Sequence, residues 1–291
     1  AGLNFADTLM VAGAYQVKPP FPFAPGLECA GMVAEAGSEA RRFQPGDRVM
    51  AVTSWGAMAE EAVADESLVF RIPDRMRFAE AAAFPVAYGT VVHALLDRGR
   101  LQPGETLVVH GAGGGVGLAA VEIGALLGAR VIATAGSEEK LTLARGYGAL
   151  HGVNYASESI RDRVKELTEG RGADVIFDAV GGDAFDQSLR AIAWDGRLLV
   201  VGFASGRIPS APANLILVKG ISVIGVHWGD FARRDPARNR AHFERMFDWY
   251  RAGKLKPHVS AAFPMDQAAA AMSAMLSRRT TGKVVIAVRP D

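Results

Sequence analysis

The chain has 291 residues, of which 49% are hydrophobic and 22% are charged. This mixture is typical of a folded globular protein and excludes an intrinsically disordered chain. Lys and Arg number 32 and Asp and Glu number 31, so the formal net charge is +1. This near-zero net charge lacks the positive excess that is typical of proteins dedicated to binding nucleic acid or an anionic membrane surface.

Cys29 is the sole cysteine, which excludes an intrachain disulfide and a cysteine-rich zinc cluster. A single thiol favours a reducing compartment, and we expect a cytoplasmic protein. No apolar run reaches the length that a membrane span requires, so no membrane association is expected. The chain opens on Ala1-Gly2-Leu3 without an initiator Met, and we expect that an N-terminal piece of the first domain precedes it.

The first part of the chain, about residues 1–85, lacks sustained helical periodicity and is interrupted by proline-rich turns. Short β-type runs occur at 31–34 and 48–52, which predicts an irregular, mostly β unit. The Ala-, Val- and Leu-rich segment 81–96 predicts a helix that leads into a second domain.

From about residue 104 the pattern changes to buried strands that alternate with helices. Strands are predicted at 107–109, 130–134, 153–155, 175–178, 197–202 and 221–226, and helices at 118–127 and 138–147. Continuous apolar strands separated by helices predict an α/β fold with a doubly wound parallel sheet. An amphipathic helix is then predicted at 238–252, followed by a tail with short β runs that include 283–288.

A glycine-rich segment, VVHGAGGGVG at 108–117, lies between the first of these strands and the helix after it. A dinucleotide turn requires Gly-x-Gly-x-x-Gly at such a junction. Gly114 and Gly117 fit its second and third positions, and Ala112 takes the first. The start of the helix, which contains Gly115 and Val116, would offer its N–H groups to a pyrophosphate. Gly113 and Gly115 are interpreted as permissive positions, and Gly111 as easing the exit from the strand. The alternative is a structural turn in which glycines serve only close packing.

The acidic residue of an NAD site normally ends the second strand, about twenty residues after the turn. Ala135 and Gly136 occupy that place, and Ser137 and Lys140 follow. A hydroxyl and a cation without a carboxylate favour a 2′-phosphate, so the predicted cofactor is NADP(H). In the alternative interpretation, Glu138 contacts the ribose and Lys140 is a solvated helix residue.

These motifs together resemble the zinc-free quinone oxidoreductase branch, the zeta-crystallin-like branch, of the medium-chain dehydrogenase/reductase superfamily. The markers are, in chain order, GLNFAD at 2–7, PGLECAG at 25–31, PGDRV at 45–49, the turn at 112–117, NY at 154–155 and TGK at 281–283. The resemblance implies a Rossmann domain, residues 86–254, inserted in a GroES-like, mostly β substrate domain, residues 1–85 plus 255–291. It also implies a homodimer joined through strand 221–226, although simple core burial also explains that strand.

Zinc is not expected. Zinc-bearing relatives carry a His before the Glu of PGLECAG, and Leu27 stands there in this chain. A catalytic zinc needs about three nitrogen, sulfur or oxygen ligands, and the six histidines show no ligand spacing. Without a Lewis acid, hydride addition to a quinone or an α,β-unsaturated carbonyl is favoured, because the resulting anion is delocalised.

The resemblance also implies the site residues. Asn4 and Tyr15 would line the substrate cleft as catalytic residues, with Tyr15 orienting the carbonyl or supplying a proton. Tyr15 could equally pack under the proline-rich loop at 19–25, and Asp7 is interpreted as structural. The implied cofactor-binding residues are Thr90, Gly114, Gly115, Val116, Gly117, Ser137, Lys140, Tyr155, Val180, Phe203, Arg278 and Lys283.

Three of these assignments have alternatives. Thr90 could be an ordinary helix residue, with Tyr88 as a second aromatic candidate nearby. Arg279 could replace Arg278 at the adenine end, and Lys283 could be only a charge at the start of an edge strand.

The predicted function is an NADPH-dependent, metal-independent oxidoreductase that transfers hydride to a conjugated carbonyl, with a quinone as the favoured small-molecule substrate. An enoyl or 2-alkenal reductase is the alternative within the same class. A non-catalytic NADPH-binding sensor or RNA-binding protein is the alternative from another class.

Overall fold

The computed structural model describes residues 1–288, and the described chain divides into two compact units. Unit 1 consists of residues 1–89 together with the segment from 229 onward, and unit 2 consists of residues 90–228. Each unit contains one six-stranded sheet. Among the described residues, no helix is long and apolar enough to cross a lipid bilayer.

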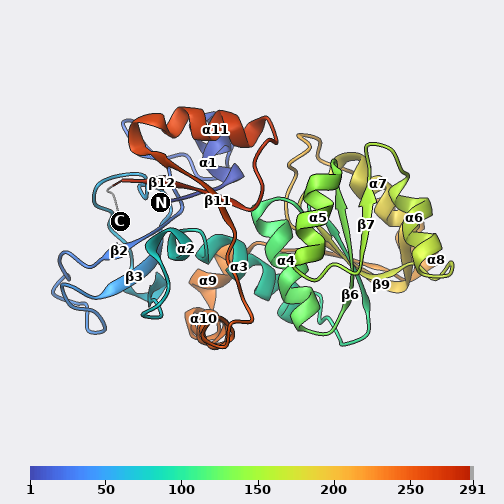
Figure 1. Cartoon of the computed structure of the whole chain (residues 1–291), viewed down its shortest axis with the longest axis horizontal. Helices are drawn as coiled ribbons and strands as arrows, with labels where there is room; N and C mark the ends of the chain where they lie inside the picture. Colours follow the sequence, from blue (N-terminus) through green and yellow to red (C-terminus); the bar gives the residue numbers. More distant parts are fainter. Residues whose placement is uncertain (289–291) are drawn as a thin grey trace. The chain divides into compact units, whose positions relative to one another are not determined.

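Unit 2 is built on a parallel sheet, as the alternating pattern of the sequence predicts (Figure 1). Its strands stand in the order β10-β9-β8-β5-β6-β7. Counted from the first strand of the unit, this order is the 3-2-1-4-5-6 arrangement of a Rossmann fold. The strands are β5 (Thr106–His110), β6 (Arg130–Ala135), β7 (His151–Asn154), β8 (Ala173–Asp178), β9 (Ile192–Val200) and β10 (Ser222–Gly225).

Helices cover both faces of this sheet. Helices α4 and α5 contact β5, β6 and β7, whereas α6, α7 and α8 contact β7, β8 and β9 and lie on the other side in Figure 1. A core of buried aliphatic side chains, including Val108, Ile132 and Ile176, lies under α6 and α7. The helices of this unit are the π-helix η2 (His93–Arg98), α4 (Gly115–Leu126), α5 (Glu138–Gly146), α6 (Ile160–Leu167), α7 (Gly182–Ala191) and α8 (Ala213–Lys219), and the boundary between the units falls within α3 (Pro85–Val92).

Unit 1 contains a sheet in the order β11-β12-β1-β2-β3-β4, antiparallel except for the β11–β12 pair. Strand β1 pairs on one side with β2 and on the other with β12, so two segments at opposite ends of the sequence form one sheet. This confirms the expected GroES-like domain made of two separate parts. The strands are β1 (Gly2–Leu3), β2 (Glu28–Met32), β3 (Arg48–Val52), β4 (Val69–Arg71), β11 (Val259–Pro264) and β12 (Lys283–Ala287).

Several helices accompany this sheet, and the sequence interpretation missed some of them, among them α1 and α11. Helix α1 lies in the segment expected to be mostly β, and helix α11 lies in the tail expected to contain only β runs. Both are short, and their apolar residues show no long helical repeat. The helices are α1 (Phe5–Val11), η1 (Glu66–Leu68), α2 (Phe78–Ala82), α9 (Trp228–Arg234), α10 (Pro236–Arg251), η3 (Met265–Gln267) and α11 (Ala268–Leu276).

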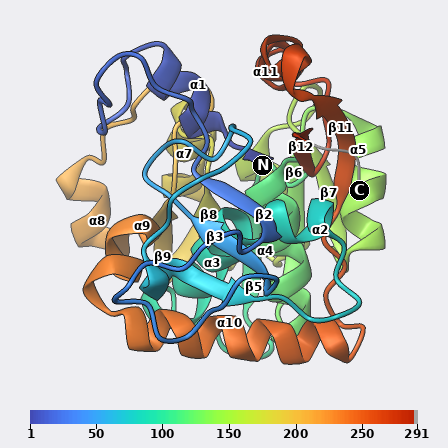
Figure 2. The same cartoon turned by 90° about the vertical axis from the view of Figure 1, so that its left-hand side faces the viewer.

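Helix α10, the long orange helix of Figure 2, groups with unit 1. Its Phe243 lies 4.1 Å from Phe70 between ring centroids, and Phe247 stacks near Phe84 at 6.2 Å. These aromatic contacts join the helix to segments of the first 89 residues. The division at residue 229 therefore differs from the expected boundary at 254, which was drawn where the alternation of strand and helix ends.

Candidate functional site

The glycine-rich turn connects β5 to α4 in unit 2. Gly111 has a φ of +68°, a left-handed conformation that costs glycine little, and its carbonyl accepts a hydrogen bond from the Gly114 amide at 2.9 Å. Gly114 is the N-cap of α4, and no side chain caps this helix. The first amides of α4 thus remain available to an anion at the positive end of the helix dipole.

Gly117 faces the same carbonyl from the first turn of the helix. A Cβ at this position would lie 2.1 Å from the oxygen of Gly111 and 2.7 Å from its carbon. Only glycine allows the helix to pack this closely on the turn. The close approach of α4 to the Gly111 carbonyl therefore explains why the third position of the motif is a glycine.

The structure changes the interpretation of two other glycines. The tight turn is made at Gly111, through its positive φ, and not at Ala112, which we expected to stand in for the first glycine of the motif. Gly113 is also more than permissive. A Cβ there would lie 2.7 to 2.8 Å from the Cβ, Cγ and Cδ atoms of Lys140, so the missing side chain leaves room for Lys140 beside the turn.

Three predicted cofactor residues gather at the carboxyl end of β6. Ser137 is the N-cap of α5, and its hydroxyl accepts from the Lys140 amide at 3.4 Å. The ring of Tyr155 lies against Gly136, where a Cβ would be 3.0 Å from the phenolic oxygen. The buried Ala135 occupies the strand end, and no carboxylate replaces it. The sequence pattern for a 2′-phosphate pocket is thus brought together in space within unit 2.

The loops after β8 and β9 lie side by side at the same edge of the sheet. One carboxylate oxygen of the buried Asp178 accepts from the amides of Val180 and Gly181, both at 2.8 Å. The carbonyl of Val180 accepts from the amide of Ser205, and Phe203 packs against Gly181. Strands β5 and β8 are neighbours at the point where the chain order reverses, which is where open α/β sheets bind ligands.

His110 lies beneath the turn, and the sequence interpretation did not single it out. Its Nδ1 is 2.9 Å from the hydroxyl of Thr134 and its Nε2 is 2.7 Å from the hydroxyl of Ser188. The Ser188 hydroxyl donates to the carbonyl of Ala184, so it accepts from a protonated Nε2. Burial lowers the pKa of His110, although the charge of Asp178 opposes this shift. A neutral imidazole therefore ties β5 to β6 and α7.

In unit 1, Asn4 and Lys283 belong to one buried polar network. The Lys283 ammonium donates to the carbonyl of Leu3 at 2.8 Å, to Asn4 Oδ1 at 2.6 Å and to Glu28 Oε1 at 2.7 Å. The Asn4 amide nitrogen donates to the same Glu28 oxygen at 2.8 Å, and the other Glu28 oxygen accepts from the Val86 amide. The network gives both residues a structural role, and their predicted roles in catalysis and cofactor binding stay predictions.

Asp7 and Tyr15 have perturbed pKa values in unit 1. Burial raises the pKa of Asp7 to about 7, against the hydrogen bond from the Asn4 amide and the charge of Lys283. Its second oxygen is buried without a hydrogen-bond partner among the described residues. Burial, and next the charge of Asp7, raise the pKa of Tyr15, which Arg233 opposes. Tyr15 is therefore a neutral phenol that can donate a hydrogen bond at physiological pH.

Of the remaining predicted residues, Thr90 lies on a helix and Arg278 lies just after one. Thr90 is a half-buried residue of α3. Tyr88 is buried on the same helix and stacks on Phe84, with centroids 4.3 Å apart and planes 7° apart. Arg278 and Arg279 are exposed beyond the end of α11, where Arg278 has a φ of +57°. Contacts of these residues with a cofactor stay predictions.

The described residues offer no metal site. Within residues 1–288, no three His, Cys, Asp or Glu side chains are grouped so as to hold a metal ion. Cys29 lies in β2 as a free thiol whose pKa is raised by burial. The expectation of a metal-free site stays a prediction.

Replacing Gly117 with Ala should destabilise unit 2 by roughly 2–4 kcal/mol, because the new Cβ collides with the Gly111 carbonyl and the start of α4 must shift. Gly146→Ala is a matched control in α5, where nothing lies within 4 Å of an added Cβ and helix propensity favours Ala by about 1 kcal/mol. Urea unfolding measures both variants. Equal stability of Gly117→Ala and the wild type would refute the close approach.

Asp7 should make unit 1 less stable as the pH rises. The pKa of Asp7 in the folded protein, about 7, exceeds the ordinary value of 3.8. Its contribution to the free energy of unfolding is therefore full below pH 4 and is lost as the pH rises through 7. Asp7→Asn removes this dependence. The free energy of unfolding of the variant relative to the wild type should therefore increase by about 2–4 kcal/mol between pH 4 and pH 8.

The control for this experiment is Asp65→Asn. Hydrogen bonds from Ser67 lower the pKa of Asp65, so its removal should cost stability at neutral pH and not at low pH. Parallel stability–pH curves for the wild type and Asp7→Asn would contradict the raised pKa of Asp7.

Comparison with known proteins agrees with this geometry. The family model described as alcohol dehydrogenase GroES-like domain matches residues 1–74, and the one described as zinc-binding dehydrogenase matches residues 115–249. A relative named quinone oxidoreductase-like protein 2 homolog, from Nematostella vectensis, is 45% identical over 98% of this chain and 79% of its own length.

Two solved structures extend the comparison. The quinone oxidoreductase of Escherichia coli, solved in complex with NADPH, superposes with a TM-score of 0.90 at 29% identity, covering 98% of this chain and 88% of that chain. The CurK enoyl reductase superposes with a TM-score of 0.88 at 27% identity, covering 98% and 87%. The protein is therefore a member of the quinone oxidoreductase branch of the medium-chain dehydrogenase/reductase superfamily, a family of oxidoreductases.

Proposed function

We propose that the protein is an NADPH-dependent, metal-independent oxidoreductase that transfers hydride to a conjugated carbonyl, with a quinone as the favoured acceptor. One observation carries the proposal: a dinucleotide turn at the reversal point of the sheet stands beside Ser137, Lys140 and Tyr155, with Ala135 in place of the acid. The complex of the Escherichia coli relative with NADPH and the quinone oxidoreductase names of the relatives support it.

In this proposal unit 2 holds the cofactor along the carboxyl edge of its sheet. The amides of Gly115, Val116 and Gly117 bind the pyrophosphate at the start of α4. Lys140 and the Ser137 hydroxyl bind the 2′-phosphate, and the Tyr155 ring flanks it. The loops that carry Val180 and Phe203 offer backbone groups to the nicotinamide half of the cofactor.

NADPH, when bound, supplies hydride from C4 of its nicotinamide ring. Hydride addition to a conjugated acceptor leaves a delocalised anion, and a hydrogen-bond donor suffices to stabilise it. Tyr15 is the proposed donor, because its raised pKa keeps the phenol protonated. Leu27 in the position of a zinc ligand and the single thiol of Cys29 support a reaction without a metal.

Reduction of an activated carbon–carbon double bond is the second candidate. The likeness to the CurK enoyl reductase supports it, and the same phenol would protonate the enolate that hydride addition produces. The two candidates share cofactor and hydride chemistry and differ in the acceptor.

Replacement of Lys140 by Ala should weaken NADPH binding at least tenfold and change NADH binding less than twofold, since only NADPH carries the 2′-phosphate that the ammonium contacts. Arg145→Ala is the control: it removes a cation from the same helix, where Arg145 pairs with Glu138. Fluorescence titration measures both dissociation constants. Equal losses for NADPH and NADH would reject the 2′-phosphate pocket.

Acceptor choice separates the two candidate activities. We expect NADPH oxidation with 1,4-benzoquinones to have the higher kcat/KM, and Tyr15→Phe to lower kcat at least tenfold while leaving NADPH affinity unchanged. Tyr250→Phe, which loses a hydrogen bond to Glu80, serves as the control and should retain activity. Turnover of enals without turnover of quinones would overturn the quinone assignment, and binding without any hydride transfer would favour a non-catalytic sensor.

The proposed assembly is a homodimer joined through segment 221–226. Strand β10 is an edge strand that pairs only with β9 among the described residues, and an open edge can pair with a second copy. The exposed Leu217 and Val218 of the preceding helix would extend the interface. Sedimentation equilibrium should give a dimer for the wild type and a monomer for Ile224→Lys. A monomeric wild type would contradict the proposal.

A further inference from the structure

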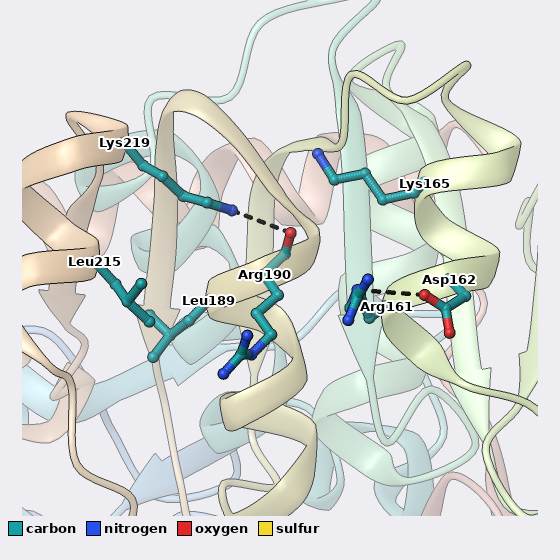
Figure 3. Close-up of a pocket in the computed structure, with 7 residues that line it drawn as sticks. All are labelled: Arg161, Asp162, Lys165, Leu189, Arg190, Leu215 and Lys219. Atoms are coloured by element: carbon teal, nitrogen blue, oxygen red, sulfur yellow. Dashed lines mark hydrogen bonds and ion pairs between the residues drawn. The ribbon is translucent and has the colours of Figure 1, made fainter.

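Unit 2 contains a second candidate ligand site away from the glycine turn. A pocket of about 450 Å³ lies between α6, α7 and α8 (Figure 3). The glycine turn lies at the carboxyl ends of the strands, whereas Arg190 and Lys219 lie in the last turns of α7 and α8, next to the starts of β9 and β10. The pocket is therefore at the opposite edge of the sheet from the proposed NADPH site.

Positive side chains dominate this pocket. Arg161 and Lys165 come from α6, Arg190 from α7 and Lys219 from α8. One lining residue, Asp162, is acidic, and its carboxylate is 3.3 Å from Nε of Arg161. The lining thus contains four cations and one carboxylate, which leaves a positive excess in a space of small-molecule size.

Two of the cations are fixed by backbone contacts. The Lys219 ammonium donates to the carbonyls of Arg190 at 3.0 Å and Ile192 at 3.3 Å. The Lys165 ammonium donates to the carbonyls of Gly170 at 3.0 Å and Arg171 at 3.2 Å. An ammonium has three protons, so each lysine keeps one donor for a ligand.

The guanidinium of Arg190 is the most available donor group. Within residues 1–288 it takes part in no hydrogen bond or ion pair, and its residue is exposed (Figure 3). Its planar fork suits bidentate contact with a phosphate or carboxylate.

The crowding of these charges has an electrostatic consequence. Burial lowers the pKa of Lys219, and the charges of Lys165, Arg190 and Arg161 lower it further. A bound anion would relieve this repulsion.

Part of the pocket lining is apolar. Leu215 of α8 is half-buried and presents apolar surface, and Leu189 of α7 is buried behind it. A ligand that fits both the cations and the apolar lining has an anionic group with two negative charges and a small apolar body.

We propose that this pocket binds a small soluble phosphate monoester, with its phosphate held by Lys165 and Lys219, towards which the unpaired Arg190 guanidinium turns on binding, and its organic group on Leu215. The proposal does not depend on the chemistry at the glycine turn, because it uses residues at the other edge of the sheet.

The test is an NMR titration of the protein saturated with NADP⁺, so that phosphate binding at the glycine turn does not contribute. We expect phenyl phosphate to shift resonances of residues 161–165, 190 and 215–219 and to bind more tightly than inorganic phosphate, and phenol not to bind. The double variant Arg190→Gln/Lys165→Gln should weaken phenyl phosphate at least tenfold. Arg75→Gln, which removes an exposed arginine from unit 1, should leave its affinity unchanged.

Two results would overturn the proposal. One is equal affinity of phenyl phosphate for the wild type and the double variant, with both still folded by circular dichroism. The other is tighter binding to vesicles containing phosphatidic acid than to phenyl phosphate, since a lipid headgroup would then be the source of the phosphate. An independent readout is the ¹⁵N-detected pKa of the Lys219 ammonium, which should rise on addition of phenyl phosphate.

Discussion

The contact between Gly117 and the carbonyl of Gly111 is the constraint on which the candidate cofactor site depends. The helix can approach the turn only because Gly117 lacks a Cβ, and Gly111 reaches its conformation through a positive φ. Together they aim the first amides of α4 at the edge where β5 and β8 diverge. The neutral ring of His110, at the end of β5, links this strand by hydrogen bonds to Thr134 of β6 and Ser188 of α7, so no charge is buried under the turn.

The proposed preference for NADPH over NADH depends on the residues next to this turn, Ala135 and Lys140. An acid at the end of β6 would repel a 2′-phosphate, and Ala135 removes that repulsion. Gly113 leaves space for Lys140, so the cation proposed to favour the 2′-phosphate lies against the glycine-rich loop that is proposed to bind the pyrophosphate. The missing side chain at Gly113 and the missing carboxylate at Ala135 thus matter as much as the presence of Lys140.

The sequence predicted the parallel sheet and the glycine turn well, because both rest on local patterns: continuous apolar strands, and glycines at a strand–helix junction. It did not predict the buried Lys283–Glu28 pair, which joins residues 255 positions apart and depends on the pairing of β1 with β12. The placement of α10 was missed for a similar reason, since its amphipathic pattern shows that one face is buried but not that Phe243 packs on Phe70. The left-handed conformation of Gly111 was not predicted, because the family motif specifies spacing and not φ.

Hydrogen–deuterium exchange of the wild type with and without NADP⁺ is the most direct measurement of the central claim, that NADPH is bound at the carboxyl edge of unit 2. The account predicts slower exchange in residues 111–117, 136–140 and 180–182, with smaller changes when NAD⁺ replaces NADP⁺ at the same concentration. Unchanged exchange in these three segments, under conditions in which NADP⁺ is bound, would contradict it.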